Sequence, residues 1–121
     1  MDVEIDLYSG RRNPSFGLAP ETGRELMSRI AALPPASAGA APPQGLGYRG
    51  LRITGGPSDG FAETVEIVVS GGVVVVRDSD GAERVLQDAG RALEHSLADL
   101  AATRLAPADM AVLRQALSGY E

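Results

Sequence analysis

The residues most able to do chemistry lie near the start of the chain, in a polar loop at residues 9–16 that follows a strand-like segment. The loop contains two adjacent arginines, Arg11 and Arg12, followed by Asn13 and a proline. A turn needs residues such as glycine, asparagine or proline, but it does not need guanidinium groups. Two guanidiniums can hold a carboxylate or a phosphate by paired hydrogen bonds. We therefore predict that Arg11, Arg12 and Asn13 bind an anionic group. The alternative is that an arginine pairs with a nearby carboxylate and braces the loop.

A second set of polar residues is expected to share one face of a sheet. Glu4, Asp6 and Tyr8 alternate with apolar residues in the first strand, whereas Arg52 and Glu66 belong to later strands. If these strands are neighbours, a pocket that removed water would allow Asp6, Tyr8 and Glu66 to act as general acids or bases. Arg52 would then contribute to ligand binding. A solvated sheet face has the same composition, and this is the alternative reading.

The composition excludes several classes of site. The chain of 121 residues has no cysteine, no lysine and a single histidine, which excludes thiol nucleophiles, cysteine-bound zinc and lysine Schiff bases. The histidine, His95, is expected on the outer side of its helix beside Asp99. The acidic segment 78–83 lacks the longer ligand run of a calcium loop and is predicted to be a hairpin turn. We therefore predict no metal and no cofactor.

Charge and hydropathy limit the partners. The net charge of −5 argues against a nucleic-acid partner, because phosphate backbones attract basic surfaces. No stretch approaches the ~18 apolar residues of a membrane span. We expect a cytoplasmic protein of one domain, residues 1–121, with no membrane partner.

The hydrophobic pattern predicts an α+β fold with a mainly antiparallel sheet of four to five strands and three helices. The expected order is β-α-β-β-β-β-α-α. The uncharged Pro/Ala-rich segment 34–47 is predicted to be a surface loop and is a possible lid. The strands are expected at residues 3–8, 48–54, 64–69, 73–77 and 83–86, and the helices at 20–33, at 89–104 and from 107 onward.

Turn chemistry predicts how the later strands pair. The two glycines at 71–72 indicate a tight hairpin that places Glu66 opposite Arg77. A bulged turn with Gly81 in the left-handed conformation then places Arg77 opposite Glu83. Both registers bring opposite charges together.

Helical spacing predicts the buried side of the helix at 89–104. Asp88 precedes it and is expected to be its N-cap. The residues expected to face the core are Leu93, Leu97, Leu100 and Ala101.

Valines occur on both faces of the predicted sheet. Val68, Val75 and Val85 share the face opposite the main core, between charged neighbours. Either helices cover both faces of the sheet, or the second face meets a partner chain. We favour a homo- or heterodimer.

The segment Val-Glu-Ile-Asp-Leu-Tyr-Ser-Gly-Arg-Arg-Asn-Pro at 3–14 and the segment Leu-Gly-Tyr-Arg-Gly at 46–50 together resemble a family of small uncharacterised bacterial proteins. That family combines a strand ending in Ser-Gly-Arg-x-Asn-Pro with a Leu-Gly-Tyr-Arg-Gly segment after a Pro/Ala-rich loop. In size and composition the chain is also similar to the small homologous proteins that pair to form the scaffold of crocagin, a ribosomal peptide natural product. The resemblance implies a peptide-binding or scaffold-forming protein of a bacterial biosynthetic pathway, which pairs with a homologous chain and binds a peptide or a small anion. The alternative is a non-enzymatic binding module such as an inhibitor, an immunity protein or an assembly adaptor.

Overall fold

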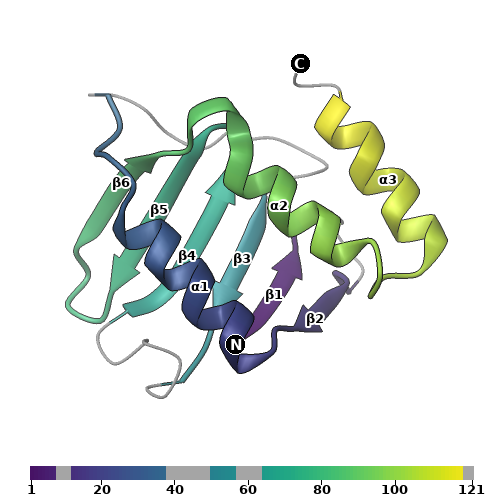
Figure 1. The fold of residues 1–121 in the computed structure, drawn as a ribbon, viewed down its shortest axis with the longest axis horizontal. Coiled ribbons are helices and arrows are strands. Elements are labelled where there is room, and N and C mark those ends of the chain that lie inside the picture. The colour runs from purple at the N-terminus through teal and green to yellow at the C-terminus, as the bar shows by residue number, and fades with distance from the viewer. Residues whose placement is uncertain (8–11, 38–49, 57–63, 119–121) are drawn as a thin grey trace.

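The computed structural model describes residues 1–7, 12–37, 50–56 and 64–118 (Figure 1). Its six strands form one antiparallel sheet in the order β2-β1-β3-β4-β5-β6. The strands are β1 (Asp2–Ile5), β2 (Ser15–Gly17), β3 (Leu51–Thr54), β4 (Thr64–Ser70), β5 (Val73–Asp78) and β6 (Glu83–Gln87). The helices are α1 (Pro20–Ala31), α2 (Ala92–Ala101) and α3 (Pro107–Ser118), and a short 3-10 turn, η2 (Ala89–Arg91), precedes α2.

The predicted α+β class and antiparallel sheet are confirmed, but the strand number was too low. The additional strand is β2, which lies in the segment predicted to be a loop and pairs with β1 so that Phe16 is opposite Val3. Its three residues are too few to show the alternation that identifies a strand. Phe16 is buried in the core, as an anchor that closes the loop.

Two predicted helices are too long. The first ends at Ala31 instead of residue 33, because a proline at 34 disfavours helical geometry in the residue before it. The second begins at Ala92 and ends at Ala101. Gly90 and Arg91 have left-handed backbone angles, so the chain turns there before the helix can start.

The predicted pairing of the later strands is confirmed. Glu66 is opposite Arg77 between β4 and β5, and Arg77 is opposite Glu83 between β5 and β6. Gly81 has a φ of 88°, as expected for the bulged turn. Both hairpins therefore have the register that their charges favour.

The free edge of β6 is partly covered by the chain that leaves α1. Ala36 donates its N–H to the Val85 carbonyl, and Gln87 donates its N–H to the Pro34 carbonyl. The start of the predicted loop 34–47 therefore contributes to the sheet, and pairing there protects an edge that could otherwise aggregate. The rest of that loop lies outside the described residues.

The helices lie on one face of the sheet (Figure 1). Helices α1 and α2 cross this face in opposite directions, and α3 lies beside α2. The core between the sheet and the helices is formed by fully buried aliphatic side chains, among them Ile5, Leu51, Ile53, Ile67, Val69, Val74, Leu93 and Leu97. No described helix covers the opposite face, so helices on both faces are not seen in this part of the chain.

Two buried carboxylates fix the start of α2. The Asp88 carboxylate accepts the N–H groups of Leu93 and Glu94 at 2.8 and 3.1 Å. The residue at the N-cap position of α2 is Arg91, so the prediction of Asp88 as N-cap was wrong in position, although its side chain does satisfy two N–H groups of the first turn. The Glu94 side chain is fully buried and accepts the Gly71 N–H at 3.0 Å and Arg91 Nε at 2.8 Å. The helix is thereby tied to the turn between β4 and β5.

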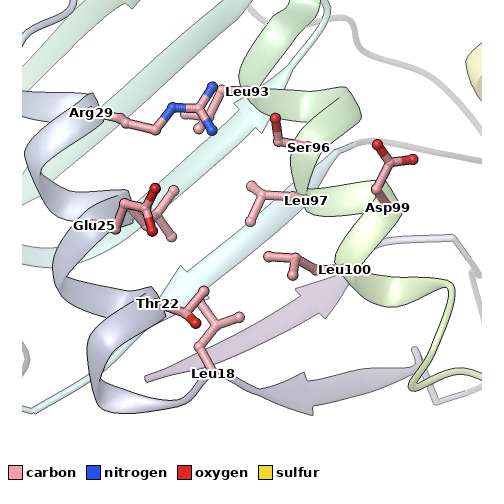
Figure 2. A pocket seen from close by; sticks show the side chains of 10 residues that line it. Leu18, Thr22, Glu25, Arg29, Leu93, Ser96, Leu97, Asp99 and Leu100 are labelled. Atoms are coloured by element: carbon pink, nitrogen blue, oxygen red, sulfur yellow. The ribbon is translucent and has the colours of Figure 1, made fainter.

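The buried side of α2 agrees with prediction except at Leu100. Leu93, Leu97 and Ala101 are buried, but Leu100 is 40% exposed. Helices α1 and α2 leave an open groove at this level, and Leu100 faces it (Figure 2).

Among the described residues, no helix is both long and apolar enough to cross a bilayer.

Candidate functional site

Asn13 braces the polar loop. Its side-chain oxygen accepts the Leu7 N–H at 3.1 Å, and its amide nitrogen lies 3.1 Å from a Glu4 oxygen and 3.3 Å from an Asp6 oxygen. The amide therefore joins the two ends of the loop and connects two carboxylates of β1 and its extension. These contacts occupy the side chain of Asn13, which was predicted to bind a ligand together with Arg11 and Arg12.

Charged side chains form a row across the face of the sheet that lacks helices. Arg52 lies 3.8 Å from Glu4 and 3.5 Å from Glu66, and Arg77 lies 2.6 Å from the other oxygen of Glu66. These four residues come from β1, β3, β4 and β5, and we call them the charged row. The alternation of signs follows from the strand registers, which place Glu4 beside Arg52 and Glu66 beside Arg77.

The charged row is already paired within the protein. Each oxygen of Glu66 lies close to a guanidinium. A general base must direct a lone pair toward the proton that it removes, whereas here the lone pairs face Arg52 and Arg77. The arrangement favours a fixed pattern of surface charge over proton transfer.

The structure brings together most of the sequence-predicted site. Asp6, Asn13, Arg52 and Glu66 are connected through Glu4. Tyr8 and Arg11 lie outside the described residues. Arg12 is exposed, and it makes no ion pair with the described part of the chain, so bracing of the loop by this arginine is not observed.

The first of the two short family-like segments contacts Gly50, the last residue of the second. Asp6 donates its N–H to the carbonyl of Gly50 at 2.9 Å. Gly50 has a φ of 113°, and a Cβ there would lie 2.7 Å from the Val69 carbonyl oxygen and from the Ser70 Cβ. Only glycine fits this approach to β4, which gives the last residue of the second segment a structural role.

A groove between α1 and α2 has a volume of about 440 Å³ (Figure 2). Leu26, Leu93 and Leu97 form its apolar base, and all three belong to the core. Leu100 and Leu18 lie at one end of the groove and Arg29 lies at the other (Figure 2). The size and the mixed lining are typical of a small-molecule or peptide site.

The charged groups of this groove are available to a ligand. Glu25 and Arg29 lie on α1 and Asp99 lies on α2, and none of their side chains has an ion pair or hydrogen bond within the described residues. Figure 2 shows Arg29 extending from α1 toward Leu93. The groove thus differs from the charged row, where the protein satisfies its own charges.

The groove was not predictable from helical periodicity, which shows which side of each helix is buried but not how far apart two helices lie. The sequence of α1 did contain one indication of a polar flank beside its buried side. Thr22, Glu25 and Arg29 recur every three or four residues beside the buried positions of α1, which places polar groups along one flank of the helix.

The position of His95 also differs from prediction. It is half-buried and faces α3, where it lines a cavity of about 230 Å³ with Met110, Leu113 and Arg114. Helix α3 packs beside α2 and covers the side that was expected to face water. Within the described ranges, no cluster of histidine and carboxylate side chains could hold a metal ion.

Comparison of the chain with protein-family models, with curated proteins and with solved structures finds no match. The function of the groove is therefore inferred from its own geometry and chemistry.

Proposed function

We propose that this protein binds a short peptide in the groove between α1 and α2. The observation that carries the proposal is the combination of an apolar base with the side chains of Glu25 and Arg29, which the described part of the protein leaves without partners. An apolar base supplies binding free energy, and a few polar groups at the rim set the orientation of the ligand.

Binding without catalysis is the simplest function for this site. The groove is lined by no lysine, cysteine or histidine, and its carboxylate Glu25 is exposed. Catalytic carboxylates are usually desolvated, and this one is not. Proton transfer by Asp6, Tyr8 and Glu66 stays a hypothesis that we favour less than ligand binding in the groove, because both oxygens of Glu66 are paired with arginines.

The biological setting is a further part of the proposal. The resemblance of the segments at 3–14 and 46–50 to small bacterial proteins supports a peptide ligand from a ribosomal natural-product pathway. An inhibitor, an immunity protein or an assembly adaptor would use the same groove for a segment of a protein partner. Intact-mass measurement of a precursor peptide, with and without this protein, separates turnover from binding alone.

We also propose that the charged row contacts a second, homologous chain. The half-buried valines Val68, Val75 and Val85 are neighbours on the face without helices. A face that alternates Glu and Arg beside apolar residues can pair with a copy of itself about a two-fold axis. This dimer would leave the groove accessible on the opposite face of the sheet.

The binding proposal can be tested with one tripeptide and two matched variants. The chain has no tryptophan, so the fluorescence anisotropy of N-acetyl-Trp-Ala-Leu reports on the peptide alone. Leu100 and Val112 are equally exposed at 40%, but only Leu100 lines the groove. We expect Leu100→Asp to weaken binding by about fivefold or more, because it places a charge beside the apolar base.

Val112→Asp is the control, because it introduces the same charge at equal exposure on α3. It should leave the affinity unchanged. Equal losses in the two variants, or no binding of the tripeptide to the unmodified protein, would contradict the proposed groove. Circular dichroism of both variants confirms that each is folded before binding is compared.

A further inference from the structure

We infer that the groove recognises the carboxyl end of an apolar peptide, with the free α-carboxylate beside Arg29 and the preceding side chains on the leucine base. This inference rests on the proposed function and names the ligand class of the same site. It follows from the order in which the chemical groups occur along the groove.

The groove is chemically polarised along its length. Arg29 is at the end that is also lined by Leu93, and Leu18 and Leu100 are at the other end (Figure 2). Arg29 is the only cation that lines the groove among the described residues. A ligand that fits this order carries an anionic group at one end and apolar groups along the remainder. Guanidinium groups match carboxylates through paired hydrogen bonds.

The length of the groove limits the number of ligand residues. Thr22 and Arg29 both line it and are seven positions apart on α1, or about 10 Å at the helical rise of about 1.5 Å per residue. An extended peptide rises about 3.3 Å per residue. Three residues therefore span the groove from Arg29 to the apolar end.

Two polar side chains of the groove can satisfy the peptide backbone. Glu25 on α1 lies at about the level of Leu97, and Ser96 on α2 lies nearer the level of Arg29 (Figure 2). The carboxylate of Glu25 can accept ligand N–H groups, and the hydroxyl of Ser96 can donate to a carbonyl or accept from an N–H. A bound peptide would thus keep its backbone groups hydrogen-bonded while its apolar side chains contact Leu97 and Leu26.

The alternative is a ligand whose end group is cationic instead of anionic. Glu25 and Asp99 are both acidic, which would favour a cationic end group. In Figure 2, however, the Asp99 carboxylate lies on the side of α2 away from α1, whereas the Arg29 side chain extends across the groove. The geometry therefore favours an anionic end group, and a cationic peptide becomes an outcome of the test.

The test compares two forms of one peptide, N-acetyl-Trp-Ala-Leu with a free carboxylate and the same peptide as its carboxamide. We expect the acid to bind at least about threefold more tightly than the amide, a modest ratio because Arg29 is exposed. In Arg29→Gln the acid should lose this advantage, while the affinity of the amide should stay unchanged. Arg24→Gln is the matched control, because Arg24 is an exposed arginine of the same helix that does not line the groove.

The outcomes separate the inference from the proposed function. Equal binding of acid and amide to the unmodified protein would overturn recognition of the carboxylate but would leave the peptide groove intact. If Arg29→Gln still bound the acid more tightly than the amide, recognition of the carboxylate by Arg29 would likewise be overturned and the peptide groove left intact. Tighter binding of the amide would show that the groove prefers a ligand without the negative charge, which also overturns the inference. Absence of binding by both forms would overturn the inference and the proposed function together.

Discussion

Asn13 shows how a residue suited to ligand binding can instead be used by the fold. A side-chain amide offers one acceptor and two donors, and here these groups contact Leu7, Glu4 and Asp6. The loop is consequently closed by a side chain rather than by backbone pairing alone. Arg12, the next residue before Asn13, is exposed beside this closure.

Replacement of Asn13 by alanine should destabilise the protein by about 1–2 kcal/mol, because the Leu7 N–H loses its acceptor in a partly buried position. Urea unfolding followed by circular dichroism measures this change. The control is Arg12→Ala, an exposed neighbour for which we expect a change within about 0.5 kcal/mol. If the two variants were equally stable, Asn13 would not brace the loop.

Local chemistry decides which contacts could be predicted from the sequence. The pairing of Glu66 with Arg77 was predictable because a two-glycine turn fixes the register of the strands beside it. The hydrogen bonds of Asn13 to Glu4 and Asp6 were not predictable, because they depend on how the loop returns to β1. The structural role of Gly50 was not predictable either, since it depends on how closely β4 approaches this residue.

At the scale of the element, the position of α2 depends on a buried ion pair. Glu94 is fully buried and contacts both Arg91 and the Gly71 N–H. The groove is formed by α1 and α2, so this anchor sets one of its walls. A buried ion pair is costly to break, because the remaining partner keeps a charge without compensation.

Glu94→Leu should therefore lower the free energy of unfolding by about 3–5 kcal/mol. Adding Arg91→Met to this variant should cost less than Arg91→Met costs in the unmodified protein, since the pair is already broken. Thermal and urea unfolding of the four proteins complete the cycle. Additive losses would show that Glu94 and Arg91 are not coupled.

The elements were predictable where their patterns are long, and they were missed where they are short. The valine-rich strands β4 and β5 and the first turn of α3 at Pro107 lie where expected. Strand β2 and the turn η2 have three residues each. Such elements form because neighbouring strands and left-handed residues position them, and no local periodicity reveals this.

At the scale of the whole molecule, the sheet has two unlike faces. One face carries α1 and α2 and encloses the core, while the other presents the charged row and half-buried valines. Sequence alternation predicted apolar groups on both faces but could not decide where the helices lie. Which face the helices cover depends on how the chain connects the helices to the sheet, and no single segment of the sequence specifies these connections.

If the charged row mediates pairing, light scattering of the purified protein should give twice the chain mass of 12.5 kDa. Val75→Lys should then give a monomer, because the lysine places an unpaired charge among Val68 and Val85. Val112→Lys on α3 is the control and should stay dimeric. A monomer for the unmodified protein would remove this proposal and leave the groove proposal untouched.

The central claim, that the groove between α1 and α2 is the ligand site, is tested most directly by mapping where the tripeptide binds. Titration of ¹⁵N-labelled protein with N-acetyl-Trp-Ala-Leu should shift the amide resonances of groove residues such as Thr22, Glu25 and Ser96. The resonances of Glu4, Arg52 and Glu66 should stay unchanged, because the sheet lies between the two sites. Shifts confined to those three residues of the charged row, or no shifts at all, would contradict the account.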